Sequence, residues 1–139
     1  MRRMLHSFVA STVTLGLLTA CNDSTTPAAS LDAPSRTLAI SGTQQRVTVG
    51  QRPADSLGVV VYGESGELLA GTTVLWAITD GRGVLSTVST VTNAIGIAQI
   101  AFNADTVPGV THVSATVGSA AAVSYEETVV VDAPARLIA

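Results

Sequence analysis

The chain has 139 residues, of which 47% are hydrophobic and only 12% charged, and its formal net charge is −3. Its seven basic residues are all arginines and are outnumbered by ten acidic residues. This balance argues against a nucleic-acid partner or a polybasic membrane patch, since both need a basic face, while the length fits one domain with a sizeable core.

Residues 1–20 have the three parts of a secretory signal in the right order. Arg2 and Arg3 give a positive start, and residues 8–18 form an apolar run that is shorter than the roughly 20 residues needed to span a bilayer. Two small residues follow and lead into Cys21, the only cysteine of the chain. We therefore expect residues 1–20 to be a signal peptide that directs export and is removed.

The segment Leu18-Thr19-Ala20-Cys21 resembles the lipobox of bacterial lipoproteins. The resemblance implies cleavage before Cys21 and transfer of a diacylglycerol to its thiol, which makes Cys21 the predicted lipid attachment site. Two or three acyl chains anchor a protein stably where one does not. A plain signal peptide followed by a chance cysteine is the alternative. Asn22 is not the aspartate that retains enterobacterial lipoproteins in the inner membrane, so the outer membrane or cell surface is favoured.

Residues 21–31 are mostly small and polar and include a proline, which predicts a flexible linker between the anchor and a folded domain. Because Cys21 is assigned to the lipid and there is no second cysteine, the domain has to be stable without a disulfide.

Beyond the linker, short runs of β-branched and apolar residues alternate with turn residues, which predicts strands and not helices. The expected strands are 38–41, 46–49, 57–62, 72–79, 86–92, 97–103, one around 113–117, and 123–131. Turns are expected at 63–66, 80–83 and 93–96. This number and spacing of strands predict an all-β, immunoglobulin-like β-sandwich of two antiparallel sheets with Greek-key connections.

Alternation along the expected strands assigns the core. The inward sets are Val74, Trp76 and Ile78; Ala98, Ile100 and Phe102; and Val113, Ala115 and Val117. Trp76 is the largest of these side chains, and we expect it to anchor the core by packing on aliphatic side chains in place of a disulfide. A surface platform for sugars is the alternative role of Trp76.

Four motifs follow one another along this region. They are Leu57-Gly58-Val59-Val60-Val61, the run from Gly66 to Trp76, the run from Thr92 to Ile100, and Pro108-Gly109 followed by Val113-Ser114-Ala115-Thr116-Val117-Gly118. Together they resemble the bacterial Ig-like domains of the intimin and invasin type (Big-1), over about residues 36–131, and we place the domain at 32–131. Leu68 and Asn93 stand where that family has Pro and Asp, both at turn positions that tolerate the change. The resemblance implies a rigid structural or adhesive spacer at the cell surface.

The segment Asp32-Ala33-Pro34-Ser35-Arg36 recurs as Asp132-Ala133-Pro134-Ala135-Arg136, 100 residues further on, and apolar residues follow each copy. The offset matches one Ig-like module with its linker, so residues 132–139 are predicted to be a tail that opens a second module. A chance match among common residues is the alternative.

Residues that could support catalysis or bind a metal are few. His112 is the only histidine after the signal peptide, and we expect it to be exposed and solvated. There is no Gly-x-Ser-x-Gly motif, no Cys/His cluster and no Asp-rich calcium loop. Asp55, Asp80 and Asp105 are expected to cap turns. The pair Glu126-Glu127 is expected to be solvated charge near a strand edge that discourages edge pairing.

We therefore predict no enzyme, no catalytic residue, no cofactor and no metal. The predicted function is that of a membrane-anchored cell-envelope lipoprotein with a structural or adhesive Ig-like domain. Its expected partners are the membrane, through the lipid anchor, and either other proteins or surface glycans. An accessory carbohydrate-binding module is the alternative, although only Tyr62 among the aromatic residues is expected to face outward, whereas Trp76, Phe102 and Tyr125 are expected inside.

Overall fold

The computed structural model describes residues 32–133. The predicted signal peptide, Cys21, the linker and most of the predicted tail lie outside these described residues. Within residues 32–133, no helix is long and apolar enough to cross a membrane.

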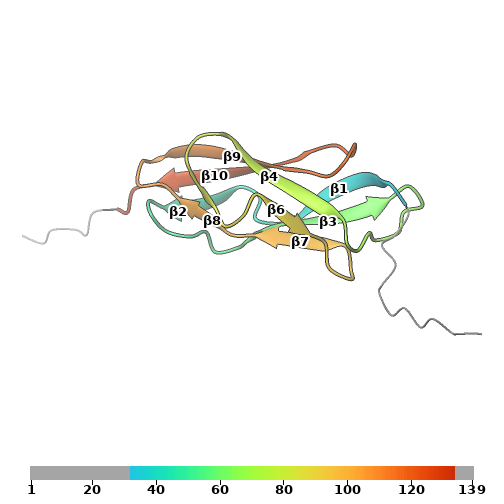
Figure 1. The fold of residues 1–139 in the computed structure, drawn as a ribbon. Helices are drawn as coiled ribbons and strands as arrows, with labels where there is room; N and C mark the ends of the chain where they lie inside the picture. The colour runs from blue at the N-terminus through green and yellow to red at the C-terminus, as the bar shows by residue number, and fades with distance from the viewer. Residues whose placement is uncertain (1–31, 134–139) are drawn as a thin grey trace, which may run out of the picture.

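The described chain folds into ten strands, arranged as a flattened, elongated sandwich (Figure 1). They are β1 (Pro34–Ser41), β2 (Gln45–Thr48), β3 (Leu57–Gly63), β4 (Thr73–Asp80), β5 (Gly83–Leu85), β6 (Ser89–Val91), β7 (Ile97–Ile100), β8 (Phe102–Ala104), β9 (Gly109–Thr116) and β10 (Val123–Val130). One sheet has the order β1-β3-β7, a second has the order β2-β10-β9-β4-β6, and β5 and β8 form a small third sheet. The predicted all-β, immunoglobulin-like sandwich is confirmed.

The prediction of two antiparallel sheets was wrong in two respects, because β2 pairs with β10 in parallel and because β5 and β8 form a separate small sheet. The chain runs along β1 in the three-stranded sheet, passes through Gly42 and joins the five-stranded sheet as β2. Gly42 has a φ of +80°, and a Cβ there would lie 2.8 Å from the Ser56 carbonyl oxygen and 2.9 Å from the Leu57 Cα. The crossing therefore needs glycine for both its conformation and its close approach.

The strand expected over residues 97–103 is divided in two. β7 pairs with β3, whereas β8 pairs with β5, and the break falls at Ala101. At the break, the Ser86 amide donates to the Ala101 carbonyl at 2.9 Å and the Ala101 amide donates to the Ser86 hydroxyl at 3.1 Å. The alternation continues through the break, so the predicted inward residues of this segment are all buried.

The predicted core is confirmed, except that Ile78 is only partly buried against it, and there is one addition. Trp76 is 2% exposed and lies with its ring centroid 6.0 Å from that of Tyr125, so it packs on an aromatic ring as well as on aliphatic side chains. The indole N–H of Trp76 donates to the Thr90 hydroxyl at 2.8 Å, which satisfies its one polar atom.

Tyr125 links the two large sheets. Its ring is buried on the inner face of β10, and its hydroxyl donates to the Gly58 carbonyl of β3 at 2.7 Å. Burial raises the pKa of the Tyr125 phenol well above its usual value, so the group remains a neutral donor.

Substitution of Tyr125 by Phe is expected to lower the free energy of unfolding by about 1–2 kcal/mol, because it removes the hydrogen bond to Gly58 and leaves the ring in place. Chemical denaturation followed by Trp76 fluorescence measures this loss. Tyr62→Phe, at a half-exposed position with no such bond, is the matched control and should change stability by less than about 0.5 kcal/mol. Equal losses in the two variants would contradict the assignment.

Candidate functional site

The two ends of the sandwich are distinct surfaces. The N-terminal pole carries residue 32 and the turns 63–66 and 93–96. The C-terminal pole carries residue 133, the loop 49–56 and the turns around Arg82 and Val107. The described chain thus enters at one pole and leaves at the other (Figure 1).

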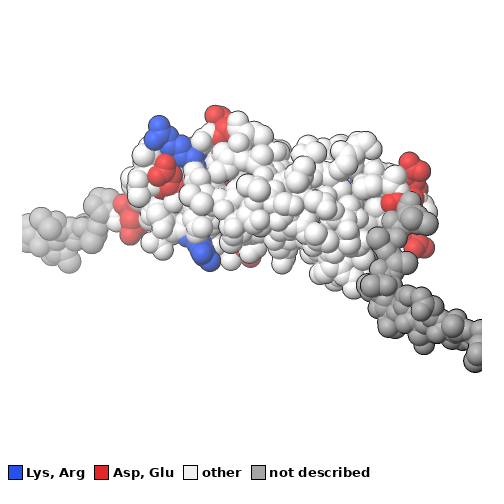
Figure 2. Space-filling model, viewed as in Figure 1, with Lys and Arg blue, Asp and Glu red and all other residues white. Residues whose placement is uncertain are grey.

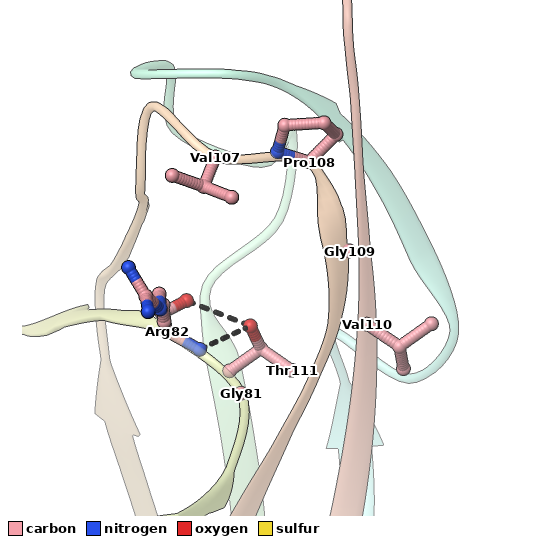
Figure 3. Close-up of a pocket in the computed structure, with 7 residues that line it drawn as sticks. All are labelled: Gly81, Arg82, Val107, Pro108, Gly109, Val110 and Thr111. Atoms are coloured by element: carbon pink, nitrogen blue, oxygen red, sulfur yellow. Dashed lines mark hydrogen bonds between the residues drawn. The ribbon is translucent and has the colours of Figure 1, made fainter.

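A hollow of about 170 Å³ lies on the C-terminal pole between the β4–β5 turn and the loop that leads into β9 (Figure 3). Its lining residues are Gly81, Arg82, Val107, Pro108, Gly109, Val110 and Thr111. Val107 and Val110 remain 48% and 44% exposed, and the Arg82 side chain is also exposed. The hollow therefore offers apolar surface beside one guanidinium group.

Hydrogen bonds fix the β4–β5 turn that forms one side of this hollow. The Thr111 hydroxyl donates to the Arg82 carbonyl at 2.7 Å and accepts from the Arg82 amide at 3.1 Å (Figure 3). Gly81 has a φ of +86°, and a Cβ there would lie 2.4 Å from the Val110 carbonyl oxygen. These contacts hold the β4–β5 turn closely against the start of β9 on one side of the hollow.

A smaller hollow of about 90 Å³ lies on the same pole, against the loop 49–56. It is lined by Arg52, Pro53, Ala54, Asp55, Ser56, Ala101 and Phe102. The Arg52 side chain is held in place by donation from its Nε to the Asn103 Oδ1 at 2.6 Å. The second hollow is lined by both Asp55 and Ser56, but no hydrogen bond joins these two side chains in the described structure. No group of three or more His, Cys, Asp or Glu side chains that could hold a metal lies within residues 32–133.

The expectation for Glu126-Glu127 was half wrong. Glu126 is exposed, but Glu127 is fully buried on the inner face of β10. β10 is not an edge strand, because β2 covers the side that β9 leaves free. The phase of the strand could have shown this, since Tyr125 was expected inside and Glu127 lies two residues further on the same face.

The buried carboxyl of Glu127 has too few hydrogen bonds to replace its lost contact with water. Its Oε1 accepts from the Gln45 side-chain amide at a long 3.4 Å, and its Oε2 has no hydrogen-bond partner among the described residues. The same Gln45 amide donates to the Asp55 carbonyl and accepts from the Asp55 amide, each at 2.9 Å. Burial raises the pKa of Glu127 to about 7, although the contact with Gln45 opposes the shift.

The remaining polar candidates are scattered. His112 lies in β9 with its side chain half-buried instead of fully exposed, opposite Glu126 on β10. Asp105 caps its turn as expected, since its Oδ1 accepts from the Thr106 amide at 2.6 Å. Asp80, expected in a turn, is the last residue of β4. The structure does not bring these residues together into one site.

Asp32 binds the 63–66 turn at the N-terminal pole, which the sequence did not predict. Its Oδ2 accepts from the Ser65 amide at 3.1 Å and from the Ser65 hydroxyl, and these bonds hold the pKa of Asp32 below its usual value. A Cβ at Gly63 would meet the Asp32 carboxylate at 2.3 Å, so only glycine allows this approach. We call this contact between Asp32 and the 63–66 turn the aspartate clasp.

The residues after Asp32 continue the clasp. Pro34 pairs with Gly63 at the start of β1, and the Ser35 hydroxyl donates to the Gly63 carbonyl at 2.7 Å. The Arg36 guanidinium lies 4.6 Å from the centroid of the Tyr62 ring. That ring face is therefore already occupied by a cation.

Charge differs between the poles. Asp32, Glu64 and Glu67 lie at or beside the N-terminal pole, where Figure 2 shows acidic side chains gathered. Arg52 and Arg82 line the two hollows of the C-terminal pole, where acidic side chains are also present.

Several solved structures have a similar fold. The Yersinia pseudotuberculosis adhesin InvE is 15% identical with a TM-score of 0.58, over 70% of this chain and 32% of InvE. The C-terminal 282-residue fragment of intimin, solved in complex with the intimin-binding domain of the translocated intimin receptor, is 22% identical with a TM-score of 0.54, over 70% of this chain and 33% of the other. Domains 4–9 of the surface layer protein SbsC are 16% identical with a TM-score of 0.55, over 76% of this chain and 15% of the other.

These likenesses establish the immunoglobulin-like fold, which agrees with the resemblance found in the sequence. The match spans about a third or less of each of these longer chains. No protein-family model and no curated protein matches the sequence.

Glu127 predicts a dependence of stability on pH. Its pKa is raised from 4.5 to about 7 on folding, so the unfolded chain loses this proton first as the pH rises. Burial of Glu127 therefore does not lower the free energy of unfolding below about pH 4.5, where the carboxyl is protonated in both states. The free energy of unfolding falls as the pH rises from about 4.5 to 7, and this loss is constant above that range. Glu127→Gln should remove the dependence and be more stable than the wild type at pH 8 by on the order of 2 kcal/mol.

Urea denaturation at pH 4.5, 6, 7 and 8 measures the effect, with Glu126→Gln on the exposed face as the matched control. A difference between the wild type and Glu127→Gln that stays constant across this pH range would contradict the assignment.

Proposed function

We propose that the protein is a cell-envelope lipoprotein, anchored through Cys21, whose Ig-like domain acts as a structural or adhesive surface module. The observation that carries the proposal is that the described chain enters and leaves the sandwich at opposite poles (Figure 1). A domain with this arrangement acts as a spacer, because whatever precedes it and whatever follows it are separated by the length of the sandwich.

The strand arrangement suits a domain that is pulled at its ends. β2 and β10 are parallel and paired in register from Gln45 opposite Glu127 to Thr48 opposite Val130. Tension toward the two poles would slide these strands past each other, so their hydrogen bonds resist together and not one at a time. The proposed mechanical role is supported by this geometry.

Proteins of similar fold support a surface location. InvE is named as an adhesin, SbsC as a surface layer protein, and the intimin fragment was solved with a receptor domain. By analogy, the proposed partners of this domain are the membrane, through the lipid, and other proteins.

We propose no catalytic role. An accessory carbohydrate-binding module is the second candidate function. That alternative depends on Tyr62, and one face of this ring already lies beneath Arg36. Specific binding on a glycan array that Tyr62→Ala abolishes would favour the alternative. Hydrolysis of a model substrate that His112→Ala abolishes would favour an enzyme.

Cys21→Ser is expected to move the protein from the membrane fraction to the soluble fraction, because the substitution removes the thiol that would carry the acyl chains. Fractionation of cells after a high-salt wash, followed by immunoblotting, measures the distribution. Asn22→Ser, next to the proposed attachment site, is the matched control and should remain with the membranes. A Cys21→Ser protein that still sediments with washed membranes would overturn the anchoring proposal.

A further inference from the structure

Residues 43–55 leave the three-stranded sheet, run beside β10 as β2 and return to β3 (Figure 1). We call this segment the strap. Its two ends lie together, because the Ser41 hydroxyl donates to the Ser56 carbonyl at 2.8 Å and Gly42 lies against Leu57. A loop with closed ends of this kind lifts without moving the strands that it joins. We propose that the strap separates from β10 when Glu127 loses its proton.

The strap buries little apolar surface. Within residues 43–55, all of which the structure describes, Val47 is the only buried side chain. β2 is the edge strand of its sheet, and its only strand partner in the described chain is β10. A segment with so few buried apolar contacts opens at a lower free energy than the core of the domain. This property belongs to the sandwich itself and does not rest on the proposed anchoring.

The returning limb of the strap is loosely packed. A hollow of about 90 Å³ lies between residues 52–56 of this limb and the pair Ala101-Phe102. Phe102 is a core residue that is 2% exposed, so the hollow reaches the edge of the core. Where atoms are already apart, few dispersion contacts have to be broken for the strap to lift.

The carboxyl of Glu127 lies next to the first residue of β2. Glu127 is fully buried and pairs opposite Gln45, whose side-chain nitrogen is 3.4 Å from the Glu127 Oε1. The same side chain donates to the Asp55 carbonyl and accepts from the Asp55 amide, each at 2.9 Å, so Gln45 joins the two limbs of the strap. The strap is thus tied together at the point where it covers the carboxyl.

An ionised Glu127 lacks donors in the closed domain. Its one donor, the Gln45 amide, is shared with Asp55, and its Oε2 has no hydrogen-bond partner among the described residues. A buried carboxylate in this state is costly unless water reaches it. Because Gln45 and β2 cover the carboxyl, separation of β2 from β10 is the movement that admits water.

No charged side chain in the described chain forms an ion pair with Glu127 in place of this water. Burial raises its pKa, and the contact with Gln45 opposes the shift. Tyr125, the next inward residue of β10, is a neutral donor to Gly58. The charged or titratable residues on the elements around Glu127 are Arg46, Arg52, Asp55, Arg82, His112 and Glu126.

Each of these groups is directed elsewhere. Arg46, Asp55 and Arg82 are exposed, and Arg82 reaches Thr111 only through its main chain. The Arg52 guanidinium donates to Asn103. His112 and Glu126 pair with each other across β9 and β10, one residue out of phase with the inward Glu127, and so lie on the outer face of the sheet.

The direction of the pH effect follows from the two states of the carboxyl. Its pKa is about 7 in the closed domain and 4.5 when hydrated. The opening constant of the strap is therefore unaffected below about pH 4.5, rises between about pH 4.5 and 7, and is constant above that range. The full rise is on the order of 100-fold.

Opening uncovers the edge of β10. The main-chain groups of residues 127–130 lose their parallel partners at residues 45–48, and an unpaired strand edge of this kind is a template for another strand. Protonation of one buried carboxyl therefore controls whether the five-stranded sheet has a covered or an open edge at this side.

Hydrogen exchange of the full chain measures the opening. The Val49 and Gly50 amides are hydrogen-bonded in the closed strap, and the Val61 amide is hydrogen-bonded in the core region. After correction for intrinsic exchange rates, the opening constant at Val49 and Gly50 should rise on the order of 100-fold between pH 4.5 and pH 8. At each pH it should exceed the opening constant at Val61.

Glu127→Gln should keep the opening constant of the strap at its pH 4.5 value across this range, whereas Glu126→Gln, on the exposed face, should behave as the wild type. A wild-type strap whose opening constant does not change with pH would overturn the proposal. Strap and core amides with equal opening constants at pH 8 would also overturn it, because the domain would then open only as a whole.

Trypsin gives an independent measurement at pH 8. The chain has no lysine, and Arg46 is the cleavable arginine of the strap because Pro53 follows Arg52. Cleavage of a native protein tracks the population of its open form when opening and closing are fast. Glu127→Gln should slow cleavage after Arg46 on the order of 100-fold relative to the wild type and Glu126→Gln, as measured from fragment masses. Equal cleavage rates in the three proteins would contradict the proposal.

Discussion

The hydrogen bond from the Tyr125 hydroxyl on β10 to the Gly58 carbonyl on β3 joins two sheets that no disulfide can link, because Cys21 is the only cysteine. Nondirectional apolar burial holds the sheets together but leaves their relative position loosely determined. A directed bond inside the core fixes that position, and Trp76 packs beside the same ring. Tyr125 therefore supplies a directed link between the two sheets, at the place in the core where antibody domains have a disulfide.

β10 also connects the core to the C-terminal pole. Its inward face runs from Tyr125 through Glu127 to Val129, and Thr111, which pairs opposite Glu127, fixes the turn at Arg82. A buried carboxyl at this position costs stability unless it is protonated or fully hydrogen-bonded. The Gln45 bridge to Asp55 supplies part of that compensation and couples β2 to the loop of the C-terminal pole. The C-terminal pole is thus joined to the core by hydrogen bonds and strand pairing.

How far the sequence predicts this structure can be judged from single residues. The inward placement of Trp76, Phe102 and Val113 followed from alternation, because a strand must put every second side chain on one face. Glu127 was misplaced because charge was given more weight than phase, and because nothing local showed that β2 would cover β10. The aspartate clasp was visible only as a repeated motif. Its partner Ser65 lies 33 residues away, and such a contact leaves no local signal.

The sequence by itself determined the class of fold, the turns and most of the core faces, because these depend on local composition, alternation and short motifs. The proposed lipid site at Cys21 likewise rests on a short motif alone. Only the tertiary structure decided that β1 and β2 belong to different sheets, that Glu127 is buried and that Arg82 and Val107 share one hollow. The physical reason is that strand partners are chosen by non-local packing. A strand's own residues encode which side chains face inward, but the neighbour that covers its edge is contributed by a distant part of the chain.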